Sequence, residues 1–141
     1  MDPTTRAVLA VCMRWIHIAS VVALLGGLIY ARLVLSPALA TLAAGERETV
    51  RKRAIDGFRP LLFTAMVMIL GSGAYNYATK ASYPPHYHMW FGIKVLLALH
   101  VFAAVILYRK GKERALTGVV ISGGAIVAIS AYLRWLSLNF K

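Results

Sequence analysis

The sequence predicts an all-α integral membrane protein, an up-down four-helix bundle that forms a single transmembrane domain. Of its 141 residues, 60% are hydrophobic and only 15% are charged, whereas a soluble domain carries about 45–50% and about 25%. A membrane-crossing helix needs roughly 20 mainly apolar residues. Four stretches meet this requirement and none contains Asp or Glu: about 15–34, 60–78, 89–108 and 115–136. The single cysteine excludes a disulfide scaffold, and the hydrophobicity excludes disorder.

The segments between the four stretches carry residues that interrupt helices. In chain order they contain Ser36-Pro37, Ala44-Gly45-Glu46, Tyr83-Pro84-Pro85 and Lys110-Gly111-Lys112. We expect the segment 49–59 to form a short surface helix that leads into the second span. Short connections between four antiparallel helices are typical of an up-down bundle.

The distribution of basic residues predicts the orientation of the spans. The net charge is +11, from 16 Lys and Arg against five Asp and Glu. Ten of the sixteen lie in or beside the first and third loops, which the positive-inside rule places in the cytoplasm. Both termini are then on the outer, periplasmic side of a bacterial inner (cytoplasmic) membrane. Cations placed beside spans indicate retention signals and contact with anionic lipid, so nucleic acid is not expected as a partner. The ten are Arg32, Arg47, Arg51, Lys52, Arg53, Arg59, Arg109, Lys110, Lys112 and Arg114.

Few ionisable residues lie inside the spans, and these are the functional candidates because lipid does not solvate them. The candidates are His17 in the first span, Lys94 and His100 in the third, and Arg59 at the start of the second, whereas Arg32 and Arg134 lie close to the ends of their spans. No span has a carboxylate, so a paired-acid hydrolase or a carboxylate proton relay has no residues to use. The alternative for each histidine is a simple hydrogen bond inside a helix bundle.

Histidines in a membrane bundle favour a metal or haem site, because neutral imidazole binds iron and copper well. His17 and His100 are the first candidates for axial ligands of haem b. His86 and His88 form an H-x-H pair in the outer loop beside Met89, and His88 is the reserve ligand. Lys94 and Arg59 are candidate cofactor-binding cations. Lys94, with Arg14 and Arg134, lies near the outer level and could neutralise haem propionates, although snorkelling to the interface is the simpler explanation for each of these three alone.

The depths of the histidines leave two geometries open. His17 lies about 22 Å above Arg32 and His100 about 13 Å above Arg109, so their levels differ by about 9 Å. Axial ligands on opposite faces of one porphyrin need nearly equal levels. One geometry is a single haem between His17 and His100, helped by tilt, and the other is an outer site that combines His17 with the loop histidines.

These observations support three functional hypotheses. The first is a b-type haem protein that transfers electrons, with quinone or other membrane redox subunits as partners, either alone or as a homo-oligomer. The second is a copper-handling protein with an outer entry site of His17, His86, His88 and Met89. The third is a non-catalytic accessory subunit of a membrane complex. If the protein is an enzyme, a haem-dependent membrane oxidoreductase is the expected class.

Several short patterns resemble a known family. Trp15-Ile16-His17 followed by Gly26-Gly27 resembles the opening of the copper-resistance D (CopD) domain superfamily and of the related HemJ-type protoporphyrinogen oxidases. Arg59-Pro60 followed by Gly71-Ser72-Gly73 is similar to their second helix, and Trp90 with Lys94 to their third. The patterns cover about 90 residues. The resemblance implies haem b or copper near His17.

For the oxidase branch, the resemblance also implies roles for His17, Arg59 and Lys94 around a tetrapyrrole. The sequence departs from that branch in the third span, where the oxidases carry a histidine closer to the cytoplasmic end. Here His100 follows Lys94 by only six residues. The departure puts the third-helix ligand of a HemJ-like porphyrinogen oxidase in question.

Overall fold

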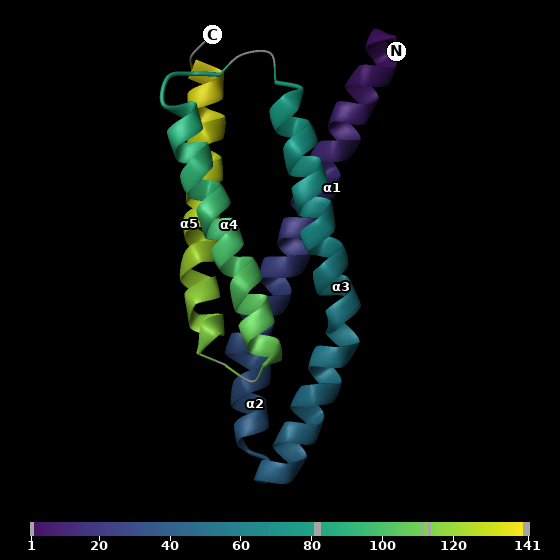
Figure 1. Ribbon diagram of the computed structural model, residues 1–141, viewed down its shortest axis with the longest axis vertical. Coiled ribbons are helices and arrows are strands. Elements are labelled where there is room, and N and C mark those ends of the chain that lie inside the picture. The colour runs from purple at the N-terminus through teal and green to yellow at the C-terminus, as the bar shows by residue number, and fades with distance from the viewer. Residues whose placement is uncertain (1, 81–82, 111, 113, 140–141) are drawn as a thin grey trace. The chain divides into compact units, whose positions relative to one another are not determined.

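The computed structural model describes residues 2–80, 83–110, 112 and 114–139, and these residues are helical apart from short turns and caps (Figure 1). Four helical segments are long and apolar enough to cross a membrane, namely Pro3–Ala40, Ala44–Ala78, Tyr87–Tyr108 and Ala115–Asn139. The prediction of an all-α chain with four potential spans is therefore confirmed. The chain divides into two compact units, Met1–Lys80 and Ala81–Lys141.

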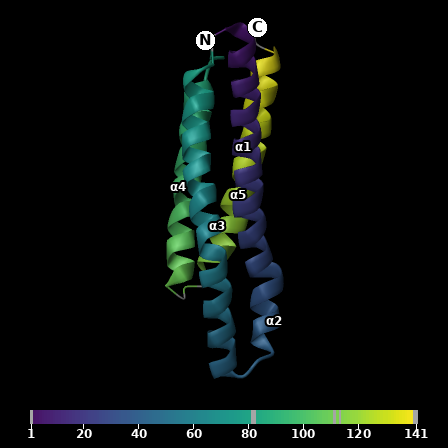
Figure 2. The same cartoon turned by 90° about the vertical axis from the view of Figure 1, so that its right-hand side faces the viewer.

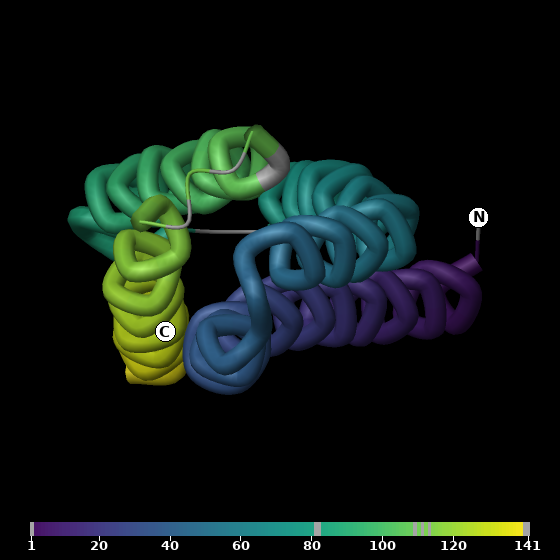
Figure 3. Tube along the Cα trace, turned by 90° about the horizontal axis from the view of Figure 1, so that it is seen from below, coloured from purple at the N-terminus to yellow at the C-terminus, as the bar shows by residue number. Residues whose placement is uncertain are grey.

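The first unit is an antiparallel helical hairpin. Its first arm consists of α1 (Pro3–Tyr30), the π-helical segment η1 (Ala31–Leu35) and α2 (Ser36–Ala40), and its second arm is α3 (Ala44–Ala78). Figures 2 and 3 show α1 beside α3, and the two helices pack against each other. Each presents one buried stripe at spacings of three and four residues, as a helix packed along one face requires. The stripes are Leu24, Leu28 and Ala31 on the first arm, and Leu62, Ala65, Ile69 and Ser72 on α3.

The first arm does not end at Ser36-Pro37, where the sequence predicts a break. Proline lacks the N–H that a continuing α-helix would bond to the carbonyl four residues back. The chain passes this point through the wider turn of η1, in which the Ser36 N–H donates to the carbonyl of Ala31, five residues back. A π-helical turn of this kind accommodates the proline without ending the helix. The arm therefore continues to Ala40.

The expected separate surface helix at 49–59 is also different in the structure. These residues belong to the single helix α3, which is 35 residues long and carries Pro60 in its interior. At 1.5 Å per residue such a helix measures about 52 Å, well beyond the roughly 30 Å of a bilayer's hydrocarbon core. The charged segment before Pro60 is thus a continuation of the same helix, and not a separate helix along the membrane surface.

Arg47 closes the turn between the two arms. Its guanidinium donates hydrogen bonds to the carbonyls of Leu39 (3.0 Å), Ala40 (2.9 Å) and Leu42 (3.2 Å). Carbonyls at a helix end have no partner inside the helix, so one side chain satisfies the end of α2 and the following turn together.

The second unit is a hairpin of α4 (Tyr87–Arg109) and α5 (Ala115–Asn139), which pack against each other. Val101, Val105 and Tyr108 form the buried stripe of α4, and Leu116, Val119 and Ile126 belong to that of α5. The N-cap of α4 is His86, which adopts a left-handed backbone conformation with φ 61°. Such a conformation is uncommon for a residue other than glycine, and here it turns the chain sharply from Pro84-Pro85 into the helix.

Candidate functional site

The imidazole of His17 is held by the paired helix of its own hairpin. His17 is half-buried on α1, and its Nδ1 atom lies 3.0 Å from the Oγ atom of Ser72 on α3. Ser72 is only 2% exposed, and its hydroxyl donates to the carbonyl of Met68, one turn earlier on α3. A serine in an apolar helix commonly bonds the carbonyl four residues back in this way. The bond to its own helix therefore holds the Ser72 hydroxyl in place independently of its contact with His17.

Gly73 makes room for the same imidazole. A Cβ atom on residue 73 would lie 3.3 Å from the Cε1 atom of His17 and 3.6 Å from its Nδ1 atom. Gly71, two residues earlier, has nothing within 4 Å of its Cβ position. Two consecutive residues of α3 thus accommodate His17: Ser72 provides a polar contact, and Gly73 provides space for the ring because it has no side chain.

His100 has a related environment in the second unit. It lies on α4, is exposed, and approaches α5 at Gly118, where a Cβ atom would come within 3.0 Å of its Nε2 atom. No hydrogen bond joins its imidazole to another residue in the described part of the chain. Each membrane-span histidine therefore packs on a glycine of the neighbouring helix, but only His17 also meets a hydroxyl.

The remaining candidate cations differ in exposure. Arg59 is exposed on α3, directly before Pro60. Lys94 is half-buried on α4, seven residues before Val101, and so shares the helix face that includes buried Val101 and Tyr108. His17 and Arg59 belong to the first unit, whereas His86, His88, Lys94 and His100 belong to the second.

The loop histidines take part in the start of α4. His86 is its exposed N-cap, and His88 is also exposed. The His88 ring lies 4.8 Å from that of Tyr83 and 6.2 Å from that of Tyr87, measured between ring centroids. Tyr87 in turn stacks on Phe91 at 6.2 Å. His88 is thus a member of an aromatic group, an environment that is also typical of residues at a membrane surface.

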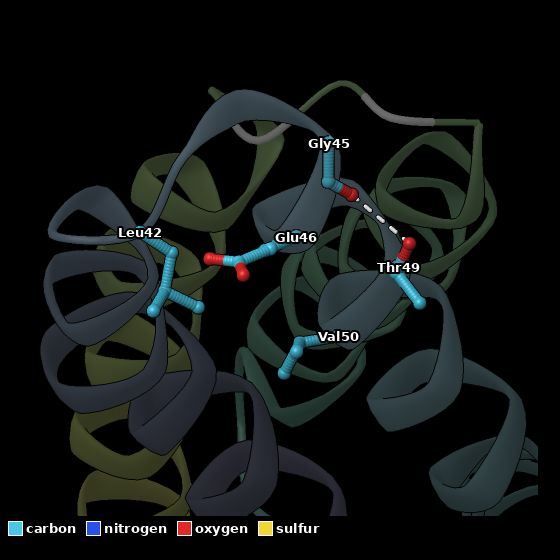
Figure 4. Close-up of a pocket in the computed structure, with 5 residues that line it drawn as sticks. All are labelled: Leu42, Gly45, Glu46, Thr49 and Val50. Carbon is cyan, nitrogen blue, oxygen red and sulfur yellow. Dashed lines mark hydrogen bonds between the residues drawn. The ribbon is translucent and has the colours of Figure 1, made fainter.

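Residues 2–80, 83–110, 112 and 114–139 contain no group of three or more His, Cys, Asp or Glu side chains placed to hold a metal ion. A shallow, open pocket of about 460 Å³ lies at the turn between α2 and α3 (Figure 4). Its lining consists of Leu42, Gly45, Glu46, Thr49 and Val50. None of the predicted site residues lines this pocket. Thr49 donates its hydroxyl hydrogen bond to the carbonyl of Gly45 at 2.9 Å, so it satisfies the first turn of α3.

The sequence patterns pointed to His17 but not to the partner that orients it. The Gly71-Ser72-Gly73 sequence predicts close helix packing and room for a flat cofactor, and Ser72 has no separate role in that interpretation. The available signal was a lone hydroxyl between two glycines in an otherwise apolar helix. Comparisons of the chain with protein-family models, with curated proteins and with solved structures found no match.

Proposed function

We propose that this chain is a membrane-embedded b-type haem protein that takes part in electron transfer, with His17 as an axial ligand. The observation that carries the proposal is the arrangement around His17: an imidazole in an apolar helix, with its Nδ1 atom held 3.0 Å from Ser72. Histidines that bind metals almost always use their second ring nitrogen in a hydrogen bond of this kind. The opposite nitrogen, Nε2, is then the one that carries the lone pair for iron.

The residues around His17 fit a haem better than a copper ion. Haem needs one or two neutral nitrogen ligands and an apolar surrounding, and α1 offers these through His17 and its exposed aliphatic neighbours Ile16 and Ile18. A protein-held copper ion needs several soft or imidazole ligands converging on one point. The contacts that His17 makes with Ser72 and Gly73 involve neither sulfur nor a second imidazole, so copper handling is the second candidate.

Haem b, when bound, would supply a one-electron couple on its iron, and the chain would bind and orient it and set its surroundings. His17 would provide a ligand, and Ser72 and Gly73 would keep its ring in place. His100 is the sequence-based candidate for a second ligand, and Lys94 is a candidate for pairing with the propionates. For Arg59, a role around the tetrapyrrole is what the HemJ-like resemblance implies. Quinone or other membrane redox subunits would be the electron partners.

The placement in the cell belongs to the same proposal. The positive-inside rule supports both termini on the periplasmic side of a bacterial inner membrane, with the four helices forming one transmembrane domain. Membership of a CopD-like or HemJ-like superfamily would agree with a haem near His17. That membership rests on the short sequence patterns, and a HemJ-like porphyrinogen oxidase activity would be a further property of such a protein.

The test is the visible spectrum of the protein purified from a bacterial membrane. We expect Soret and α bands on reduction in the unaltered protein and their loss in His17→Ala. A His17→Ala protein with an unchanged haem spectrum would contradict the proposal. A colourless protein with stoichiometric copper would favour the copper candidate, and a protein with neither would favour an accessory subunit.

The second ligand is tested with the same measurement. His100→Ala should convert a six-coordinate, low-spin spectrum to a high-spin one if His100 is an axial ligand. A change to high spin in His88→Ala or His86→Ala, with His100→Ala unaffected, would instead assign the second ligand to the turn that begins α4.

A further inference from the structure

The hydroxyl of Ser72 lies between the imidazole of His17 and the backbone of α3. We infer that Ser72 is a positioning residue that holds His17 in the Nδ1–H tautomer and so makes Nε2 its metal-binding nitrogen. The inference rests on the proposed haem function, but the tautomer itself is a property of the chain alone.

The tautomer follows from a count of protons. A serine hydroxyl has one proton to donate and lone pairs that accept. The Oγ atom of Ser72 donates to the carbonyl of Met68, with the carbonyl of Ile69 also 3.5 Å away. The proton of Ser72 therefore points to its own helix backbone. The remaining contact of Oγ, at 3.0 Å from Nδ1 of His17, has to be one in which Nδ1–H donates.

The opposite tautomer is disfavoured at this position. With the proton on Nε2, Nδ1 would present a lone pair to a hydroxyl oxygen whose proton is already used on α3. The Ser72 hydroxyl would have to turn away from the carbonyl of Met68 and give its one proton to Nδ1, so this form makes one hydrogen bond where the Nδ1–H form makes two. Buried polar groups that lose their partners are costly, and Ser72 is 2% exposed.

Gly73 allows the ring to reach this contact. Gly73 lies beside the imidazole, with its Cβ position 3.3 Å from Cε1 of His17, so the ring lies close to the α3 surface. A tightly placed imidazole with one nitrogen fixed by a hydrogen bond presents the other nitrogen in a defined direction. A hydrogen-bond acceptor on Nδ1–H also makes the imidazole more basic, which favours the oxidised metal.

The experiment begins without any metal. Protein labelled with ¹⁵N in its histidines, and prepared free of haem, reports the tautomer of each imidazole through its two nitrogen shifts. We expect His17 to be Nδ1-protonated in the unaltered chain. In Ser72→Ala we expect a shift towards the Nε2–H form, which is the commoner one in water.

Two further variants separate the inference from general disruption. Ser72→Thr retains a hydroxyl that bonds the same carbonyl, and should restore the Nδ1–H form. Ser130→Ala is the matched control, because Ser130 also donates to a carbonyl four residues back, that of Ile126 at 2.7 Å, but belongs to the other unit. It should leave His17 unchanged. An unaltered helical circular dichroism spectrum and unfolding midpoint in each variant show that the fold is intact.

A second measurement addresses the metal. We expect Ser72→Ala to weaken haem binding about 10-fold, as typical for loss of a group that orients a metal ligand, and to raise the reduction potential. The inference is overturned if His17 is Nε2-protonated in the unaltered chain, or if Ser72→Ala leaves its tautomer unchanged. Failure of the unaltered chain to bind haem would overturn the proposed function, while the nitrogen shifts would still decide the role of Ser72.

Discussion

The phenyl ring of Phe58 on α3 occupies the space that a side chain on Gly27 of α1 would need. A Cβ atom on residue 27 would lie 2.1 Å from the Cζ atom of Phe58 and 2.4 Å from its Cε1 atom. The neighbouring Gly26 has nothing within 4 Å of its Cβ position. Two adjacent glycines thus have different roles, and only one of them permits the close approach of the helices.

We therefore expect Gly27→Ala to destabilise the first hairpin by about 1–3 kcal/mol, the usual cost of overpacking a filled contact. Gly26→Ala should leave the stability unchanged or raise it slightly, because alanine is the better helix former. The midpoint of thermal unfolding in detergent, followed by circular dichroism, measures both. The double variant Gly27→Ala/Phe58→Ala should show less than additive loss, as for residues in contact. Equal midpoints for the two glycine variants would contradict this account of the interface.

A second glycine pair tests the environment of His17. Gly73→Ala places a methyl group 3.3 Å from the Cε1 atom of the imidazole, which the ring can relieve only by moving a few tenths of an ångström. We expect a shifted His17 signal in ¹⁵N spectra and a cost of about 1 kcal/mol. Gly71→Ala, with open space at its Cβ position, is the control and should change neither. A perturbation of His17 by Gly71→Ala as large as that by Gly73→Ala would argue against the arrangement.

Arg47 offers a test of the turn between α2 and α3. Its replacement by alanine removes three hydrogen bonds to the carbonyls of Leu39, Ala40 and Leu42. We expect a loss of about 1–2 kcal/mol, since the guanidinium is partly in water and each bond is worth little alone. Amide hydrogen exchange across 39–47 should become faster.

Arg47→Lys should not restore slow exchange, because an ammonium group cannot reproduce a planar fork that reaches several carbonyls. Arg53→Ala, which removes an exposed cation of the same helix, is the control and should leave exchange in the turn unaltered. Unchanged exchange in Arg47→Ala would show that the turn closes without this side chain.

The start of α1 should respond to acid. The backbone N–H of Thr5, and then its hydroxyl, donate to the carboxylate of Asp2 and hold the pKa of Asp2 below its ordinary value. A group whose folded pKa is lowered contributes stability that is present above its unfolded pKa and is lost as pH falls through its folded pKa. Amide exchange at Thr5 should therefore accelerate only below the ordinary range of aspartate titration. Asp2→Asn should abolish that pH dependence, and an Asp2 carboxyl that titrates at its ordinary pKa in ¹³C spectra would contradict the assignment.

The prediction of helices from the sequence succeeded where composition decides the outcome and failed at their ends. Acid-free apolar runs of about 20 residues have few alternatives to a helix in lipid, because their backbone groups must be bonded internally. The end of a helix depends on whether its last carbonyls find partners. At Pro37 the π-helical turn supplies them and the helix continues. After Ala40 the helix ends, and the guanidinium of Arg47 donates to the carbonyls of Leu39, Ala40 and Leu42.

The candidate site likewise has one part that the sequence predicts and one part that depends on tertiary contacts. An ionisable side chain inside an apolar span is costly to place in lipid and so is a functional candidate from the sequence alone. His17 and His100 could both be identified in this way. Both lie in apolar segments, and their neighbours in the chain do not show what either imidazole contacts. Their difference comes from the partner helix, which offers a serine and a glycine to His17 and a glycine to His100.

The sequence by itself determined the number of spans, their apolar character and the few polar side chains within them, because burial in lipid constrains composition directly. Only the tertiary structure decided that Ser72, 55 residues from His17 along the chain, meets its Nδ1 atom. It also decided that Gly27, Gly73 and Gly118 face side chains, whereas Gly26, Gly71 and Gly124 do not. Helical periodicity describes which residues share a face. Which atoms touch depends on the register between two helices, and that register is fixed by side-chain packing across the interface.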